Sequence, residues 1–167
     1  MSTARSLALD APGSVEEILQ LVAEHARELV GAERCRAEIR LPDGVTVHAH
    51  ADAEPDAEAV SVAPAEVAAL YAAVAPGRRS LRMSSAELAA EPARRTLEGA
   101  ADRVRSMRSW LVASLCAPDG REFGLIQAFD KRDGEFTHLD EEVLVELAQM
   151  AATAVERAQR YADGSRP

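Results

Sequence analysis

The chain has 167 residues, which is long enough for one domain to bury a core without metal or disulfide crosslinks. Its 28 acidic and 19 basic residues give a formal net charge of -9. This charge argues against nucleic acid or an anionic membrane as a partner, because both require an electropositive surface. There is no apolar run of about 18 residues to span a membrane, and the first residues lack a signal-peptide core. Only two cysteines occur, which suits a reducing compartment, so we expect a cytoplasmic protein.

The first third of the chain predicts a helix followed by a β-hairpin. Residues 1–13 are small and polar and predict a disordered tail. Ser14 and Glu17 form a capping signal, and apolar residues at helical spacing then continue to a glycine stop at Gly31. After Gly31 the apolar residues occur at every second position, on either side of a Pro-Asp-Gly turn at 42–44. This spacing predicts two antiparallel strands up to residue 52.

The middle of the chain predicts a second helix, a short strand and an irregular segment. Pro64 begins a helical pattern that places Tyr71 and Val74 on one face. Residues 79–83 predict a short strand. Ser84 and Glu87 then cap a partly helical stretch that extends to about residue 106.

The last third predicts a second hairpin and a long helix. Residues 109–117 and 121–130 flank another Pro-Asp-Gly turn and are apolar on both faces, so we expect central strands that are covered on both sides. From Thr137 the apolar residues return to helical spacing until about Tyr161, which leaves 162–167 as a C-terminal tail. The pattern as a whole predicts an α+β fold with an antiparallel sheet between layers.

Short motifs in this last third resemble those of the GAF domain, a small-molecule sensing module. The matching residues are Ser109, Trp110, Leu111, Gly124, Leu125, Ile126, Gln127, Asp130, Lys131, Phe136, Thr137, Asp140 and Glu141. The resemblance covers residues 14–161 and is strong only after Ser109. It implies a sheet of five to six strands in the order 2-1-5-4-3. It also implies terminal helices on one face of the sheet, with the middle helix and loops over the other.

The segment from Asp130 to Glu141 resembles the signature described in cyclic-nucleotide-binding GAF domains, with Asp130 in place of Asn. Its residue types nevertheless favour a structural role at the start of the last helix. Phe136 can act as a hydrophobic staple, Thr137 can cap, and acids in the first turn complement the helix dipole. Lys131 is positioned to pair with Asp140. We therefore interpret this motif as structural, with the residues Asp130, Lys131, Phe136, Thr137, Asp140 and Glu141.

The resemblance also implies a ligand pocket under the middle helix. The candidate residues are Tyr71, Val74, Leu81, Arg82, Met83, Met107, Trp110, Val112, Gln127 and Phe129. Arg82 and Gln127 are the polar candidates, since a pocket needs a few convergent polar atoms for specificity. An apolar lining with little free space would instead be ordinary core, and this alternative stays open.

We expect no metal and no cofactor. Thr46, His48, His50 and Asp52 share one face of a strand, but no third metal ligand accompanies the two histidines. A solvent-facing polar stripe explains the same alternation. No histidine lies in an evident pocket segment to ligate haem, and no Cys-His pair is present to attach a tetrapyrrole.

The resemblance implies a non-catalytic regulatory domain that binds an unknown small molecule and signals through its terminal helices. The setting would be bacterial-type signal transduction or transcription regulation. It also implies a homodimer through the first and last helices. Because only six residues follow Tyr161, we expect either an effector protein acting in trans or a larger regulator of which this chain is a piece. Two alternatives remain, a dimerisation scaffold with a filled pocket and a free-methionine sulfoxide reductase-like enzyme. The enzyme would need two reactive thiols, whereas Cys35 and Cys116 lie in apolar strands and are interpreted as buried.

Overall fold

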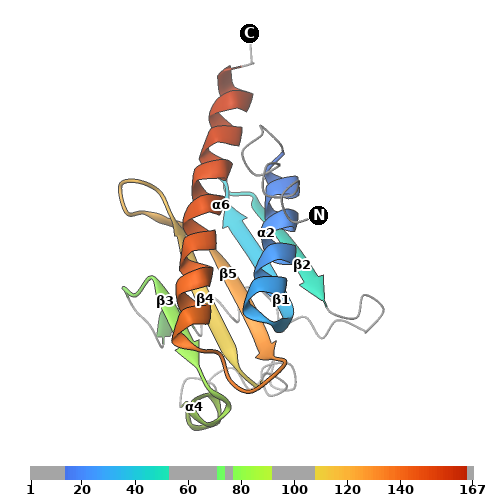
Figure 1. Cartoon of the computed structure of the whole chain (residues 1–167). Coiled ribbons are helices and arrows are strands. Elements are labelled where there is room, and N and C mark those ends of the chain that lie inside the picture. The colour runs from blue at the N-terminus through green and yellow to red at the C-terminus, as the bar shows by residue number, and fades with distance from the viewer. Residues whose placement is uncertain (1–13, 53–70, 74–76, 92–107, 165–167) are drawn as a thin grey trace.

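The computed structural model describes residues 14–52, 71–73, 77–91 and 108–164. Five strands in these ranges form one antiparallel sheet in the order β2-β1-β5-β4-β3, which confirms the fold class and strand order expected from the sequence (Figure 1). The elements are α2 (Val15–Val30), β1 (Ala32–Arg40), β2 (Thr46–Asp52), β3 (Ser80–Met83), α4 (Ser85–Ala90), β4 (Trp110–Cys116), β5 (Glu122–Lys131) and α6 (His138–Gly164). Residues 71–73 are helical, and the rest of the expected second helix lies outside the described residues.

Helices α2 and α6 lie side by side on one face of the sheet and run in opposite directions (Figure 1). Between them and the sheet lies the main apolar core, with Leu19 and Val22 from α2 and Leu144 from α6. Alanines along the buried stripe of α6, including Ala148 and Ala151, let the helix approach the strands closely. Apolar side chains therefore fill the space between these helices and the middle of the sheet.

Local signals set the ends of the two helices. Ser14 Oγ accepts a hydrogen bond from the Glu17 amide at 3.1 Å, and Gly31 ends α2 with a φ of 65°, which glycine adopts without a Cβ clash. Helix α6 continues to Gly164, three residues beyond the end expected at Tyr161. The short helix α4 begins with the expected capping box, in which Ser84 and Glu87 bond reciprocally.

Gly124 lets β5 and β1 approach each other. A Cβ at this position would lie 2.4 Å from the Glu38 carbonyl oxygen and 2.8 Å from the Ile39 side chain. We expect Gly124→Ala to lower the free energy of unfolding by about 2 kcal/mol, because the two central strands must separate. Urea denaturation measures this loss.

A matched control for this variant is Gly120→Ala in the second hairpin turn. A Cβ there meets nothing within 4 Å, so the variant carries only the strain of a positive φ, about 1 kcal/mol. Equal losses in the two variants would contradict the steric role of Gly124.

Candidate functional site

The candidate site lies on the face of the sheet opposite α2 and α6, which we call the distal face. The strand register places its side chains in parallel rows across the sheet. The central row consists of His50, Arg36, Gln127, Val112 and Leu81, and the next row consists of Asp52, Arg34, Phe129, Trp110 and Met83. Each row combines polar residues from the first hairpin with apolar residues from β3 and β4.

Most of the residues predicted to line a pocket lie together on this face. Tyr71, Leu81, Met83, Trp110, Val112, Gln127 and Phe129 are all buried and lie outside the core under the helices. The Tyr71 ring meets the Trp110 ring edge-on, with a centroid separation of 6.4 Å, and its hydroxyl donates to the Arg78 carbonyl. Burial raises the pKa of Tyr71, and so does the nearby Glu122 carboxylate. Val74 and Met107 lie outside the described residues.

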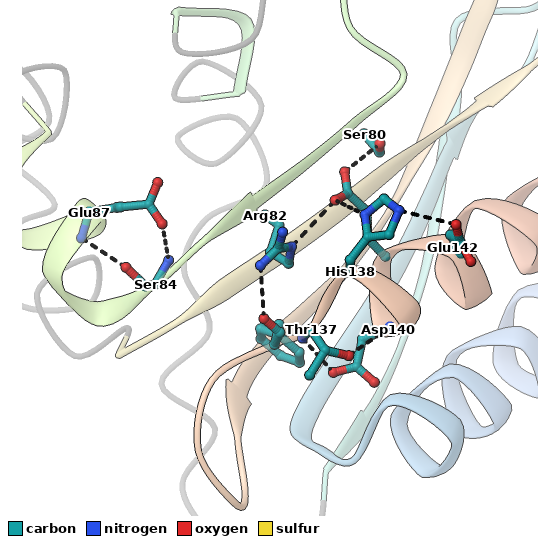
Figure 2. Close-up of polar contacts among 10 residues, drawn as sticks. Ser80, Arg82, Ser84, Glu87, Thr137, His138, Asp140 and Glu142 are labelled. Atoms are coloured by element: carbon teal, nitrogen blue, oxygen red, sulfur yellow. Dashed lines mark hydrogen bonds and ion pairs between the residues drawn. The ribbon is translucent and has the colours of Figure 1, made fainter.

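Arg82 does not belong to this group. It pairs with Leu111 across β3 and β4, so its side chain points to the helix side of the sheet. Its Nε lies 3.4 Å from Glu141 Oε1 and its Nη1 donates to the Phe136 carbonyl at 3.3 Å. Figure 2 shows Arg82 reaching from β3 toward the start of α6 near Thr137 and Asp140. The interpretation of Arg82 as a polar pocket group is therefore wrong, and its contacts join β3 to α6.

Trp110 and Gln127 form a buried polar pair at the centre of the distal face. Trp110 Nε1 donates to Gln127 Oε1 at 3.1 Å, and both side chains are fully buried. Because the indole nitrogen is only a donor, it fixes the orientation of the amide. Gln127 Nε2 is then left buried, with no hydrogen-bond partner among the residues that the structure describes. Such a group costs about 1 to 3 kcal/mol unless something accepts its hydrogen bonds.

Arg36 is the functional candidate that the sequence reasoning missed. It lies beside Gln127 across β1 and β5, and its Nε is also buried without a hydrogen-bond partner in the described ranges. Burial lowers the pKa of Arg36, while the charge of Glu38 raises it. The alternating pattern of β1 could have identified it, because Cys35 and Ala37 face the core and Arg36 therefore lies on the distal face of an interior strand.

The polar stripe of the first hairpin is only partly exposed to solvent. His48 and His50 are exposed as expected, whereas Asp52 is partly buried. On the neighbouring strand β1, Arg40 is exposed and Glu38 is buried. Burial raises the pKa of Glu38, and the charges of Arg36 and Arg40 lower it. Glu38 is covered because β1 is an interior strand flanked by β2 and β5.

A groove of about 850 Å³ opens at the end of the sheet that carries the two hairpin turns. Its lining includes Glu38, Leu125 and His48, which form the row next to Arg36 and Gln127. The groove continues around the sheet end to Glu156 and Gln159 of α6. The described residues contain no cluster of three or more His, Cys, Asp or Glu side chains that could hold a metal ion.

The residues of the Asp130 to Glu141 motif contact other parts of the protein. Lys131 Nζ lies 2.9 Å from Asp140 Oδ2, which confirms the predicted pair, and also donates to the Val30 carbonyl at 2.7 Å. Thr137 and Asp140 cap each other's backbone amides, and Phe136 is buried. Each of these contacts is made at the junction of β5, α2 and α6.

Asp130 directly precedes Lys131 at the end of β5. Its backbone has a φ of 61°, in the left-handed region, and only 5% of the residue is exposed. One carboxylate oxygen accepts from the amides of Arg108 and Ser109, and the other lies 3.1 Å from Arg34 Nη2. Asp130 thus joins β1, β5 and the approach to β4.

The two cysteines lie on opposite faces of the sheet. Cys35 belongs to the core under the helices, and burial raises its pKa to about 12. Cys116 lies at the end of β4 on the distal side, 3.6 Å from Ser114 Oγ, and is only partly buried. The interpretation of both thiols as fully buried is therefore correct for Cys35 and wrong for Cys116.

Solved structures with the same fold define the class of this domain. GAF3 from Slr1393 of Synechocystis sp. PCC6803, in its photoproduct state, is 18% identical with a TM-score of 0.64, over 92% of this chain and 100% of that one. Residues 122 to 287 of a methyl-accepting chemotaxis protein are 17% identical with a TM-score of 0.65, over 95% and 98%. The bacteriophytochrome RpBphP3 from R. palustris is 12% identical with a TM-score of 0.67, over 96% and 37%. These likenesses show a shared α+β fold.

The GAF domain family model matches residues 14–155, and the chain therefore belongs to the GAF domain family. Among curated protein sequences, none matches this chain significantly. Within the described ranges, no helix combines the length and apolar character that crossing a membrane requires.

Proposed function

We propose that this chain is a non-catalytic regulatory GAF domain that binds a small molecule on its distal face and signals through α2 and α6. The observation that carries the proposal is the buried Gln127 amide, held by Trp110 with its Nε2 unpartnered among the described residues. Buried polar groups in native proteins nearly always have a partner, so an exception points to a missing one. A ligand with an acceptor atom would supply it.

Strand β3 links the distal face directly to the first turn of α6. Leu81 and Met83 of β3 lie on the distal face, while the intervening Arg82 contacts Glu141 at the start of α6. Ser80 Oγ also donates to Glu141 at 2.7 Å. A ligand that displaces β3 would therefore pull on the first turn of α6. We expect the output to pass through a second copy of the chain or an effector protein in a cytoplasmic signalling pathway.

The catalytic alternative has less support. Reduction of a sulfoxide by thiols requires a thiolate and a second thiol within reach. With a pKa of about 12, Cys35 is thiolate in only about one molecule in 10⁵ at neutral pH. Cys116 lies across the sheet from it, so the two thiols do not face a common substrate.

A thermal-shift screen tests the proposed function. A ligand present at about 100 times its dissociation constant stabilises the protein by about 2.7 kcal/mol, which is readily seen as a rise in Tm. We expect at least one class among nucleotides, amino acids, carboxylates and aromatic compounds to raise Tm, and Gln127→Leu to abolish the rise. If no compound raises Tm and light scattering shows a dimer, the dimerisation scaffold is the better description.

A further inference from the structure

We infer that the small molecule bound on the distal face carries a carboxylate, held between Arg36 and Gln127. This inference rests on the proposed function, since it names the chemical class of the ligand at the same site. It depends on two neighbouring side chains that both offer hydrogen-bond donors and lack acceptors in the described part of the chain.

The two donors lie next to each other on the same face. Arg36 and Gln127 are direct register partners on antiparallel strands, where Cβ atoms lie about 4.5 to 5.5 Å apart. Trp110 occupies Gln127 Oε1, so Gln127 can present only its Nε2 donors to a ligand. Arg36 adds a planar guanidinium, whose paired donors match the two oxygens of a carboxylate.

The charges around this position favour a monoanion. Arg34 already pairs with Asp130, so Arg36 is the cation nearest to Gln127 that forms no ion pair within the described residues. Glu38 lies two residues along the same strand and attracts Arg36, but forms no hydrogen bond with it in the described structure. A dianion such as phosphate would be repelled by Glu38 with only one guanidinium to offset it. A neutral ligand would leave the half-buried Arg36 charge without a counter-ion.

The side chains around Gln127 also indicate the chemical character of the rest of the ligand. Val112 flanks Gln127 in the same row and Leu125 lies in the adjacent row, and both are buried. The Trp110 ring, which bonds Gln127, and the Tyr71 ring packed edge-on against it add aromatic surface nearby. A carboxylate with a small apolar or aromatic body would therefore place its charged end at Arg36 and its body against these side chains.

The test compares carboxylates with neutral analogues of the same shape. The probes are benzoate, 3-phenylpropionate and butyrate, each beside its amide, measured by thermal shift and calorimetry on the full chain. We expect at least one acid to bind and its amide to bind at least about tenfold more weakly, as loss of a charge-assisted hydrogen bond predicts. Arg36→Gln should weaken binding of the acid by at least about tenfold. Arg40→Gln, which removes an exposed cation from the same strand and face, should change it less than about twofold.

A second measurement does not depend on the choice of probe. Gln127→Glu keeps the acceptor for Trp110 and places a carboxylate beside Arg36. We expect the unliganded variant to have a higher Tm than the same substitution made in an Arg36→Gln background, because the new carboxylate pairs with Arg36. It should also lose binding of the acids.

The outcomes separate this inference from the proposed function. If amides bind as tightly as acids and Gln127→Leu abolishes both, the sensor function stands and the carboxylate inference is overturned. If Arg36→Gln and Arg40→Gln bind acids equally well, Arg36 does not hold the ligand and the inference is overturned. If none of the acids raises Tm, the inference fails whether or not other compounds bind.

Discussion

Asp130→Ala should lower the free energy of unfolding by about 3 to 5 kcal/mol, the largest effect that we expect from a single substitution. The variant removes a buried carboxylate that accepts from two backbone amides and pairs with Arg34 at 3.1 Å. It also places alanine at a φ of 61°, where a Cβ without a polar side chain is strained. Urea denaturation followed by circular dichroism measures the loss.

Asp130→Asn is the matched control for this prediction. Asparagine tolerates the left-handed backbone and keeps an oxygen for the amides of Arg108 and Ser109, but it loses the ion pair with Arg34. We expect a loss of about 1 to 2 kcal/mol. A destabilisation below 1 kcal/mol for Asp130→Ala would show that these contacts contribute little to stability.

Lys131→Met should lower the free energy of unfolding by about 3 kcal/mol. The ammonium group is mostly buried and donates to the last turn of α2 through the Val30 carbonyl and to Asp140 in the first turn of α6. Methionine keeps the apolar stem but leaves the carbonyl and the carboxylate without this donor. The two helices would then lose their shared contact at this end of the sheet.

A double-mutant cycle isolates the Lys131–Asp140 pair. Asp140→Asn retains an oxygen for the Thr137 amide, so it removes the charge and keeps the helix cap. We expect a coupling energy of about 1 to 2 kcal/mol between Lys131→Met and Asp140→Asn in urea denaturation. Purely additive losses would contradict a direct interaction between these side chains.

Features that depend on residues close together in the sequence were predicted correctly, whereas the placement of Arg82, which depends on strand pairing, was not. The helix from Ser14 to Gly31, both Pro-Asp-Gly hairpins and the Lys131–Asp140 pair were predicted correctly, because each depends on residues close together in the sequence. Arg82 was placed on the wrong face. The alternation of the four-residue strand β3 does not say which of its faces meets the helices until its pairing with β4 is known.

The sequence by itself determined the helices, the hairpins and their order along the chain, because turns, caps and apolar periods specify them locally, and its motifs resemble those of the GAF domain. Only the tertiary structure decided which polar side chains are deprived of water. Arg36 and Gln127 lie on strands far apart in the chain, and they are register partners because β5 inserts between β1 and β4. Burial and register are properties of the assembled sheet, so the unpartnered donors that define the candidate site arise only when the strands pair.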